Sequence, residues 1–355
     1  MNSIEANKCL IHFNASCYTA LNQHLSGRNF SKIFILVDEN THEHCLPHLL
    51  EKLETTSVIE IIEIESGEIN KNIETCLGVW NTLSELDADR KSLLINIGGG
   101  VITDLGGFVA CTFKRGIAYV NVPTTLLSMV DASVGGKTGV DLGHLKNQIG
   151  VISNPDLVLI DTQYLNTLPQ NQMRSGLAEM LKHGLISDIS YWNKFQDLSK
   201  LSFNDLDELI YESVLIKKHV VDVDPFENGL RKSLNFGHTL GHAIESYFLS
   251  SPEKTTLLHG EAIVIGMILA SYISTELTGF PKQTTLDIKR LFVDYYGKVT
   301  INQEDLQPII ELLKFDKKNT HGNINFVLLE SIGNPKIDCL VDDTIILDAF
   351  KFYAS

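Results

Sequence analysis

The first half of the chain alternates short apolar runs with amphipathic stretches of helical period. The apolar runs span residues 32–37, 58–64, 92–97, 118–122 and 157–160. Each run is bounded by Gly, Pro, Asp or Asn, as buried parallel strands usually are. Helical patterns lie between the runs, for example over 68–86. This alternation predicts an open α/β sheet of the Rossmann-like class.

The pattern changes after about Leu168, where long amphipathic stretches replace the alternation. They predict helices over 170–186, 205–221, 236–248, 260–277 and 285–296. A strand-like pair, 324–329 and 336–340, precedes a last helix. We therefore predict two domains, an α/β domain over residues 1–165 and a mainly α-helical domain over residues 166–355.

Composition narrows the class of protein. The net charge of the 355-residue chain is −15, which argues against non-specific nucleic-acid binding but leaves room for a small anionic substrate. Six cysteines without CxxC spacing indicate free thiols in a reducing compartment. The sequence shows neither a leader pattern nor a run of 18 apolar residues, so we expect a cytoplasmic protein without a membrane partner.

A glycine-rich turn follows the third apolar run. In the sequence SLLINIGGG, a predicted strand is followed directly by Gly98, Gly99 and Gly100, and a helical pattern comes next. Such a turn lets the backbone approach a pyrophosphate at a helix start, although it is also a common packing solution. Asp104, one turn into the helix, could bind a ribose hydroxyl or favour the helix dipole. Glu68 and Lys71 open another predicted helix and could contact the same nucleotide.

Residues 115–150 gather groups that suit a phosphate. GGKT resembles the tail of a P-loop, but Asp131 stands where that motif requires its first glycine, which argues against a mononucleotide P-loop. Donor side chains nevertheless flank the Gly–Gly pair: Arg115, Lys137, Lys146 and Asn147. In an acidic chain, this grouping favours an anion site over a loop of solvated lysines.

Three histidines and one glutamate suggest a metal site. His238 and His242 are one helical turn apart, His259 starts a later helical stretch, and Glu179 lies in a largely apolar one. Neutral imidazoles with one carboxylate fit a catalytic zinc site. Spacing alone nominates His238 and His242 as the simplest pair, but it leaves the ligand set open. Lys217, Arg231 and Asn235 could bind a substrate carboxylate or be ordinary helix-surface groups.

Taken in order, these motifs resemble those of the 3-dehydroquinate synthase family over about residues 37–318. The motifs that carry the resemblance are GGGVITDLGGFVA, VPTTLLSMVDASVGGKTGVD, AEMLKHGLI, NFGHTLGHAIE, LHGEA and FDKK. The resemblance implies a homodimeric lyase with NAD in the first domain and one divalent metal, Zn²⁺ or Co²⁺, in the second. It also implies a step of the shikimate pathway, which leads to aromatic amino acids.

The resemblance assigns a role to each candidate residue. The metal ligands would be Glu179, His238 and His259. Contacts to NAD would come from Glu68, Lys71, Gly98, Gly99, Gly100, Asp104, Thr124, Thr125, Asp131, Lys137 and Lys146. The catalytic groups would be Asp131, Lys137, Lys182 and His242. The substrate would be bound by Lys146, Asn147, Lys217, Arg231, Asn235, Lys317, Lys318 and, from the other subunit of the dimer, Arg115.

The implied reaction converts 3-deoxy-D-arabino-heptulosonate 7-phosphate into 3-dehydroquinate and phosphate. It combines a transient oxidation, phosphate elimination, re-reduction and an intramolecular aldol closure. Three alternatives stay open: a related cyclase acting on another sugar phosphate, a metal-dependent dehydrogenase, and a catalytically inactive binding protein. Against the related cyclase, the dehydroquinate interpretation is favoured by Lys217, Arg231, Asn235 and the Asp316-Lys317-Lys318 run. A dehydrogenase would not need the GGKT and Lys146-Asn147 phosphate stretch.

Overall fold

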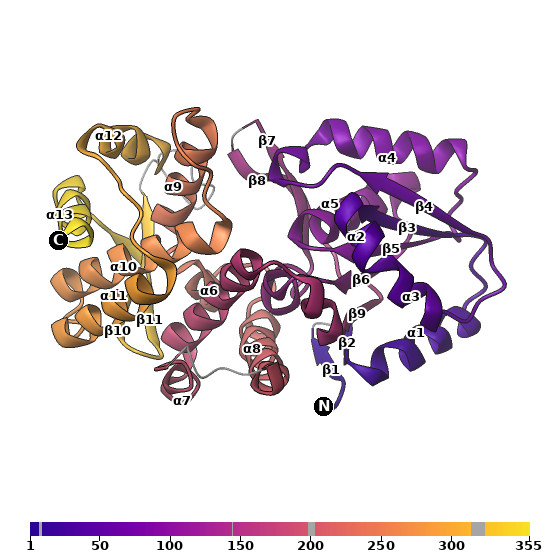
Figure 1. The fold of residues 1–355 in the computed structure, drawn as a ribbon, viewed down its shortest axis with the longest axis horizontal. Coiled ribbons are helices and arrows are strands. Elements are labelled where there is room, and N and C mark those ends of the chain that lie inside the picture. Colours follow the sequence, from indigo (N-terminus) through magenta and orange to yellow (C-terminus); the bar gives the residue numbers. More distant parts are fainter. Residues whose placement is uncertain (7–8, 144, 198–202, 314–323) are drawn as a thin grey trace. The chain divides into compact units, whose positions relative to one another are not determined.

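The computed structural model describes the chain apart from residues 7–8, 144, 198–202 and 314–323. It divides the chain into two compact units (Figure 1). The first contains residues 1–173 and 217–222, and the second contains 174–216 and 223–355. Along the chain, the first unit ends at Met173 before the second begins. The predicted domain boundary between residues 165 and 166 stays a prediction.

A seven-stranded sheet with the order β1-β2-β9-β6-β5-β3-β4 organises the first unit. The strands are β1 (Ile4–Ala6), β2 (Cys9–Phe13), β3 (Ile33–Asp38), β4 (Ile59–Ile64), β5 (Leu93–Gly98), β6 (Ala118–Pro123) and β9 (Leu157–Ile160). Apart from the antiparallel β1–β2 pair, neighbouring strands are parallel. The predicted α/β class is therefore confirmed. The sequence did not predict β1 and β2, because neither contains a continuous apolar run.

Helices cover both faces of this sheet: α1 (Ala15–Gly27), α2 (Glu39–His44), α3 (Leu46–Lys52), α4 (Ile73–Glu85) and α5 (Gly100–Thr112). Figure 1 shows α4 on one side of the sheet and α1 and α3 on the other. Phe34 and Leu36 of β3 join the core under α4 and α5, whereas the alternate residues Ile33 and Ile35 face the opposite side. Burial on both faces explains why the strands read as uninterrupted apolar runs.

The 115–150 stretch contains a hairpin that the sequence did not indicate. It contains the short turns η2 (Phe113–Arg115) and η3 (Ser128–Ala132), followed by an antiparallel pair, β7 (Lys137–Leu142) and β8 (Leu145–Ile152). The hairpin escaped prediction because KTGVDL and LKNQIGVI mix polar residues and glycines into the strands. The predicted helix over 68–86 is also divided, into the turn η1 (Glu68–Asn70) and α4.

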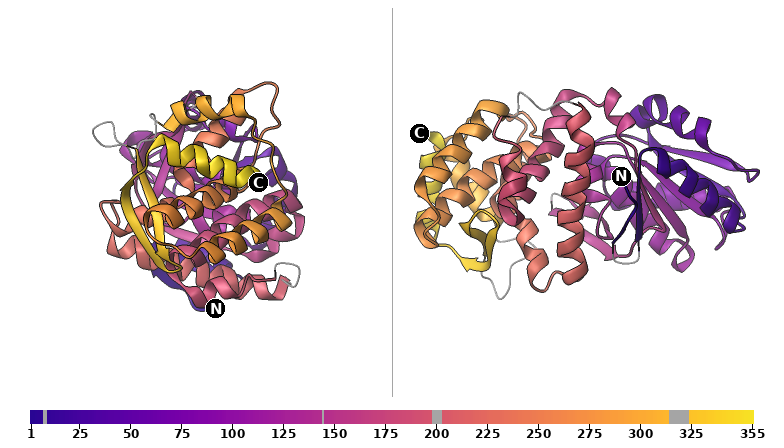
Figure 2. Two further views of the ribbon diagram at one scale, coloured as in Figure 1. Left: turned by 90° about the vertical axis from the view of Figure 1, so that its left-hand side faces the viewer. Right: turned by 90° about the horizontal axis from the view of Figure 1, so that it is seen from below.

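The second unit is mainly helical, with one β-hairpin. Its helices are α6 (Gln170–Ser187), α7 (Ile189–Asn193), α8 (Phe203–Val223), α9 (His238–Ser250), α10 (His259–Leu277), α11 (Lys282–Tyr296), α12 (Gln303–Leu312) and α13 (Asp343–Ala354). The hairpin is formed by β10 (Asn325–Ser331) and β11 (Asn334–Leu340). It lies alongside the helices in Figure 2. The first turn of α6 and residues 217–222 of α8 belong to the first unit.

The long apolar helix α10 is the centre of the second unit. It packs against α9, α11, α13 and β10. By length and composition alone α10 could cross a membrane, but 72% of its apolar window is buried inside the structure. That burial is what the core helix of a globular unit shows. α9 and α10 are neighbours, and the ring centroids of His238 and His259, the first residues of these two helices, are 5.5 Å apart.

Candidate active site

The glycine-rich turn sits at the carboxyl end of β5, where α5 begins. A Cβ atom at Gly98 would lie 2.5 Å from Cβ of Ile102, and one at Gly99 would lie 3.0 Å from Cγ2 of Thr125. The N–H of Thr124 donates to the carbonyl of Gly98 over 3.0 Å, which ties the ends of β5 and β6 together. Side chains are thus excluded from a helix start at the carboxyl edge of a parallel sheet. This arrangement fits a dinucleotide pyrophosphate.

A buried charge cluster lies beside this turn. Nζ of Lys71 donates to Asp104 over 2.6 Å and to Oδ1 of Asn147 over 2.7 Å. Lys146 approaches Glu68 at 2.9 Å. Burial alone would lower the pKa of Lys71, but Asp104 and Glu68 outweigh it and raise that pKa. Burial raises the pKa of Asp104, and the positive charge of Lys71 only partly offsets this rise. The structure therefore gathers predicted nucleotide and phosphate contacts into one cluster.

Asp131 and Lys217 form a close ion pair within the first unit. Asp131 lies in η3, a single π-helical turn, and Nζ of Lys217 donates to both its main-chain and side-chain oxygens over 2.5 Å. Lys137 starts β7 after Gly135 and Gly136, which have φ angles of 102° and 69°. A Cβ at Gly136 would lie 2.3 Å from the side chain of Asn154, so this turn requires glycine for space as well as for backbone conformation.

The candidate metal ligands converge within the second unit. Nε2 of His238 lies 3.4 Å from Oε1 of Glu179, and Nε2 of His259 lies 3.6 Å from the same oxygen. Ligand atoms at ordinary Zn–N and Zn–O distances around a tetrahedral ion are about 3.3 Å apart. Both nitrogen–oxygen distances are therefore within a few tenths of an ångström of a tetrahedral edge. The donor set and its geometry fit a divalent ion.

A second contact holds each of these two imidazoles. Nδ1 of His238 is 3.1 Å from the carbonyl oxygen of Phe236, and Nδ1 of His259 is 3.2 Å from Oε2 of Glu245. In each ring this contact leaves Nε2 facing Glu179, as metal-binding histidines usually require. Burial would lower the pKa of His259, but Glu245 and Glu179 outweigh it and raise that pKa to about 10.

His242 lies one helical turn beyond His238 and faces the same cluster. Its ring centroid is 5.1 Å from that of His238 and 5.6 Å from that of His259. One ring nitrogen from each of the three histidines lies within 4.8 Å of the others. The histidines of both ligand sets that the sequence left open therefore lie in one cluster. Contacts to Glu179, however, involve His238 and His259.

Other predicted site residues of the second unit are held by local partners. Nζ of Lys182 donates to Glu179, one turn away on α6. Arg231 is 1% exposed and donates through Nη1 to the carbonyl of Pro225 over 2.7 Å. Nδ2 of Asn235 donates to Glu227 over 2.7 Å. Lys182 therefore lies at the metal cluster, whereas Arg231 and Asn235 pack against the loop before η6 (Leu230–Asn235).

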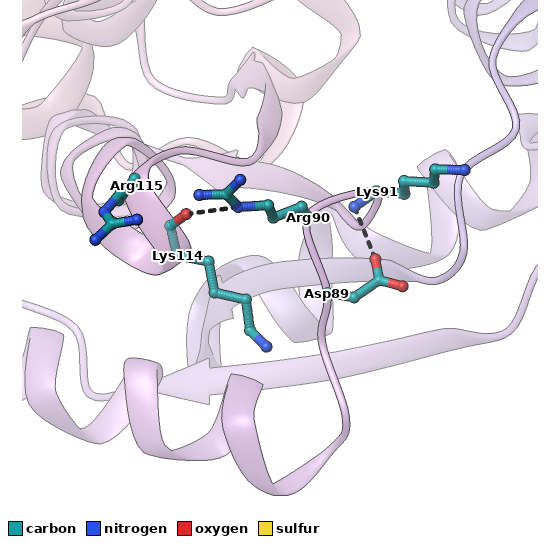
Figure 3. A pocket seen from close by; sticks show the side chains of 5 residues that line it. All are labelled: Asp89, Arg90, Lys91, Lys114 and Arg115. Carbon is teal, nitrogen blue, oxygen red and sulfur yellow. Dashed lines mark hydrogen bonds between the residues drawn. The ribbon is translucent and has the colours of Figure 1, made fainter.

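Arg115 lies apart from the charge cluster, at the corner after α5. It lines a pocket of about 740 Å³ with Asp89, Arg90, Lys91 and Lys114 (Figure 3). Nε of Arg90 donates to the carbonyl of Lys114 over 3.2 Å. Lys114 and Arg115 have left-handed φ angles of 50° and 70°, which is uncommon for residues other than glycine. The strained corner thus presents a cationic surface on an acidic chain. Lys317 and Lys318 lie outside the described residues.

Sequence reasoning did not identify Asp141 and Glu245, two buried carboxylates that contact predicted site residues. Glu245 follows His238 by seven residues, so helical spacing places both on one face of α9. That spacing could have suggested it. Asp141 had no comparable signal, because its contacts depend on the unpredicted β7–β8 hairpin.

Comparison with known proteins follows the same division of the chain. Residues 61–175 match the family model described as 3-dehydroquinate synthase N-terminal, and residues 176–319 match the C-terminal model. A 3-dehydroquinate synthase of Parabacteroides distasonis is 42% identical over 335 residues, which are 94% of this chain and 94% of that protein.

Two solved structures share the fold across the whole chain. One is 2-epi-5-epi-valiolone synthase from Streptomyces hygroscopicus subsp. jinggangensis 5008 with NAD⁺ and Zn²⁺ bound. It is 25% identical, with a TM-score of 0.83, and the match covers 100% of this chain and 99% of that one. The other is 2-deoxy-scyllo-inosose synthase complexed with carbaglucose-6-phosphate, NAD⁺ and Co²⁺. It is 24% identical, with a TM-score of 0.83 over 99% of each chain. Together, the two family models and the relative from Parabacteroides distasonis show that this chain belongs to the 3-dehydroquinate synthase family.

Proposed function

We propose that this chain converts 3-deoxy-D-arabino-heptulosonate 7-phosphate into 3-dehydroquinate and phosphate, as a carbon–oxygen lyase. The observation that carries the proposal is the convergence of His238, His259 and Glu179 on one point of a chain of this family. The Gly98–Gly100 turn supports a bound NAD, because it leaves a helix start open to a pyrophosphate.

We assign the metal to Glu179, His238 and His259, and NAD to the glycine turn with its neighbours. Those neighbours are Glu68, Lys71, Asp104, Thr124, Thr125, Asp131, Lys137 and Lys146. When bound, NAD accepts and returns a hydride, and a Zn²⁺ or Co²⁺ ion polarises the hydroxyl group that is oxidised. Two imidazoles and one carboxylate are ligands that suit either ion.

The chain's own donors bind the anionic ends of the substrate. We assign the phosphate to Lys137, Lys146 and Asn147, together with His242, which stands one turn from a metal ligand. An imidazole at that place can donate to the leaving phosphate and stabilise the negative charge that develops on its oxygens. Lys317 and Lys318 are proposed for the same phosphate on the strength of the sequence resemblance.

We assign the substrate carboxylate and hydroxyl groups to Lys182, Lys217, Arg231 and Asn235. Lys217 already donates to Asp131, so a substrate group that reaches this pair can donate to Asp131 and accept from Lys217. Arg231 is held by the loop of Pro225, which reduces the conformational entropy lost when it binds an anion. Arg115 is proposed to reach the phosphate of a second copy in a cytoplasmic homodimer.

The alternatives predict different products. A related cyclase would release phosphate from a sugar phosphate that lacks the carboxylate, and a dehydrogenase would accumulate NADH without releasing phosphate. We expect the purified protein with NAD and Zn²⁺ or Co²⁺ to form phosphate and dehydroquinate in equal amounts from the heptulosonate phosphate. Chelation should abolish both products. Phosphate release from the corresponding heptulose phosphate alone would contradict the proposal, as would the absence of any product.

A further inference from the structure

Asp141 contacts two segments that carry proposed site residues, although it has no assigned role itself. It lies in β7 and is 8% exposed. Its Oδ1 accepts the main-chain N–H of Asn147 over 2.6 Å, and its Oδ2 lies 3.7 Å from Nζ of Lys146. Its own main-chain N–H donates to the carbonyl of Lys71 over 2.9 Å. All four residues belong to the first unit.

The bond from Asn147 to Asp141 holds an uncommon backbone conformation. Asn147 has a φ of 51°, in the left-handed region that few residues other than glycine adopt. The same residue uses its side-chain Oδ1 to accept from Nζ of Lys71 over 2.7 Å. Lys71 also pairs with Asp104 over 2.6 Å. A continuous chain of contacts therefore joins Asp141, through Asn147 and Lys71, to the helix that follows the glycine turn.

The ammonium group of Lys146 is placed by two carboxylates. Glu68 lies 2.9 Å from its Nζ, and Asp141 lies 3.7 Å away on the same hairpin. The cluster as a whole holds two positive groups, Lys71 and Lys146, against three carboxylates. Burial raises the pKa of Asp141, and the charge of Glu68 raises it further. Keeping Asp141 ionised therefore has an energetic cost, which the N–H of Asn147 and the two lysines offset.

We propose that Asp141 is a positioning residue that holds Lys146 and Asn147 in the geometry with which they bind the substrate phosphate. This inference rests on the proposed function, because it concerns the phosphate contacts of that same site. Asp141 would act through these two neighbours without touching the substrate. The nearby Lys71 and Asp104 contacts imply that the same carboxylate also keeps the phosphate contacts in register with the NAD contacts.

Two substitutions separate the two contacts of Asp141. Asp141→Asn keeps an oxygen that can accept from Asn147 but removes the charge opposite Lys146, whereas Asp141→Ala removes both. We expect inorganic phosphate to bind the NAD- and metal-loaded Asp141→Asn protein about tenfold more weakly, and the Asp141→Ala protein about 100-fold more weakly. Calorimetry measures this binding directly. In turnover, KM should rise more than kcat falls, since the affected contacts are made before and during reaction.

Asp156→Asn is the matched control. Asp156 is a partly buried carboxylate of the same unit that pairs with Arg28 over 2.6 Å, away from the cluster. The Asp156→Asn substitution should leave phosphate affinity and KM unchanged. Phosphate affinity within twofold of wild type in both folded Asp141 variants would overturn the proposal. If Asp141→Ala does not fold, the near-isosteric Asp141→Asn decides by the same criterion. Phosphate and NAD binding can be measured without turnover. If the wild-type protein binds phosphate but makes no dehydroquinate, the proposed function is refuted and the role of Asp141 in phosphate binding can still be tested.

Discussion

At the scale of residues, the metal site depends on how each imidazole is oriented. His238 is held by a main-chain carbonyl and His259 by Glu245, and both direct Nε2 at the same oxygen of Glu179. His242 shares the cluster and, in the proposed function, serves the phosphate. The two ligand sets that spacing and resemblance suggested therefore make opposite predictions for His242 and His259.

We predict that His238→Ala and His259→Ala lose bound metal, whereas His242→Ala retains it. Removing one of three protein ligands leaves an incomplete site, but removing a phosphate donor leaves the ligand geometry intact. Metal analysis of the three purified variants measures this, with NAD binding as the check that each is folded. A metal-free His242→Ala beside a metal-replete His259→Ala would reverse the assignment.

The pKa of His259 predicts how metal binding depends on pH. In the metal-free protein that pKa is raised from 6.5 to about 10, so the imidazole is protonated near neutral pH. A divalent ion requires the neutral ring, so binding should release about one proton from this residue. Apparent affinity should rise about tenfold per pH unit across about pH 7–9. Calorimetry in buffers of different ionisation enthalpy counts the proton, and release of none would refute the raised pKa.

The same pKa predicts the stability of the metal-free protein. A pKa that folding raises contributes stability fully below about pH 6.5, and that contribution is lost as pH rises through about 10. The melting temperature of the chelated protein should therefore fall over this range more than that of His259→Gln. The variant controls for the other titrating groups.

At the scale of elements, glycines set the distance between the helices that carry the ligands. A Cβ at Gly266 of α10 would lie 2.0 Å from the carbonyl oxygen of Gly237 and 2.8 Å from the main-chain N of Gly241. The backbones of α9 and α10 therefore approach more closely than any larger residue permits. This approach brings His238 and His259 within reach of one ion.

Gly266→Ala should therefore weaken both the fold and the metal site. We expect a loss of about 1–3 kcal/mol or more in the free energy of unfolding, because the methyl group would press against main-chain atoms. Metal affinity should fall as well.

Gly78→Ala is the matched control, since Gly78 lies inside α4 with nothing within 4 Å of an added Cβ. The Gly78→Ala protein should gain about 0.5–1 kcal/mol in the free energy of unfolding. Denaturant unfolding measures both, and an unaffected Gly266→Ala would contradict this explanation.

Elements with a strong periodic signal were predictable from the sequence. The buried strands β3, β5 and β9 read as apolar runs because both faces are covered, and the helical pattern over 260–277 correctly predicted α10. The β7–β8 hairpin was not predictable, since its two strands mix polar residues and glycines and contain no continuous apolar run. Asp141 was missed with it, because Lys71 lies 70 positions away in the sequence.

At the scale of the whole molecule, the proposed homodimer gives Arg115 a role in the site of a second copy. If Arg115 binds the phosphate of a partner subunit, Arg115→Ala and His259→Ala should each be inactive alone. Mixing them should restore part of the activity, because some hybrid dimers contain one intact site. Activity of the mixture, after subunit exchange has been demonstrated, measures this. No recovery would show that each copy supplies its own phosphate contacts.

In the proposed reaction the oxidation of the substrate is transient, so NAD is regenerated in every cycle. The most direct test follows NADH absorbance and dehydroquinate together while substrate is in large excess over NAD. The proposed function predicts many molecules of dehydroquinate and phosphate for each NAD, with no net NADH in the steady state. NADH that accumulates in proportion to the substrate consumed would contradict it and would identify a dehydrogenase.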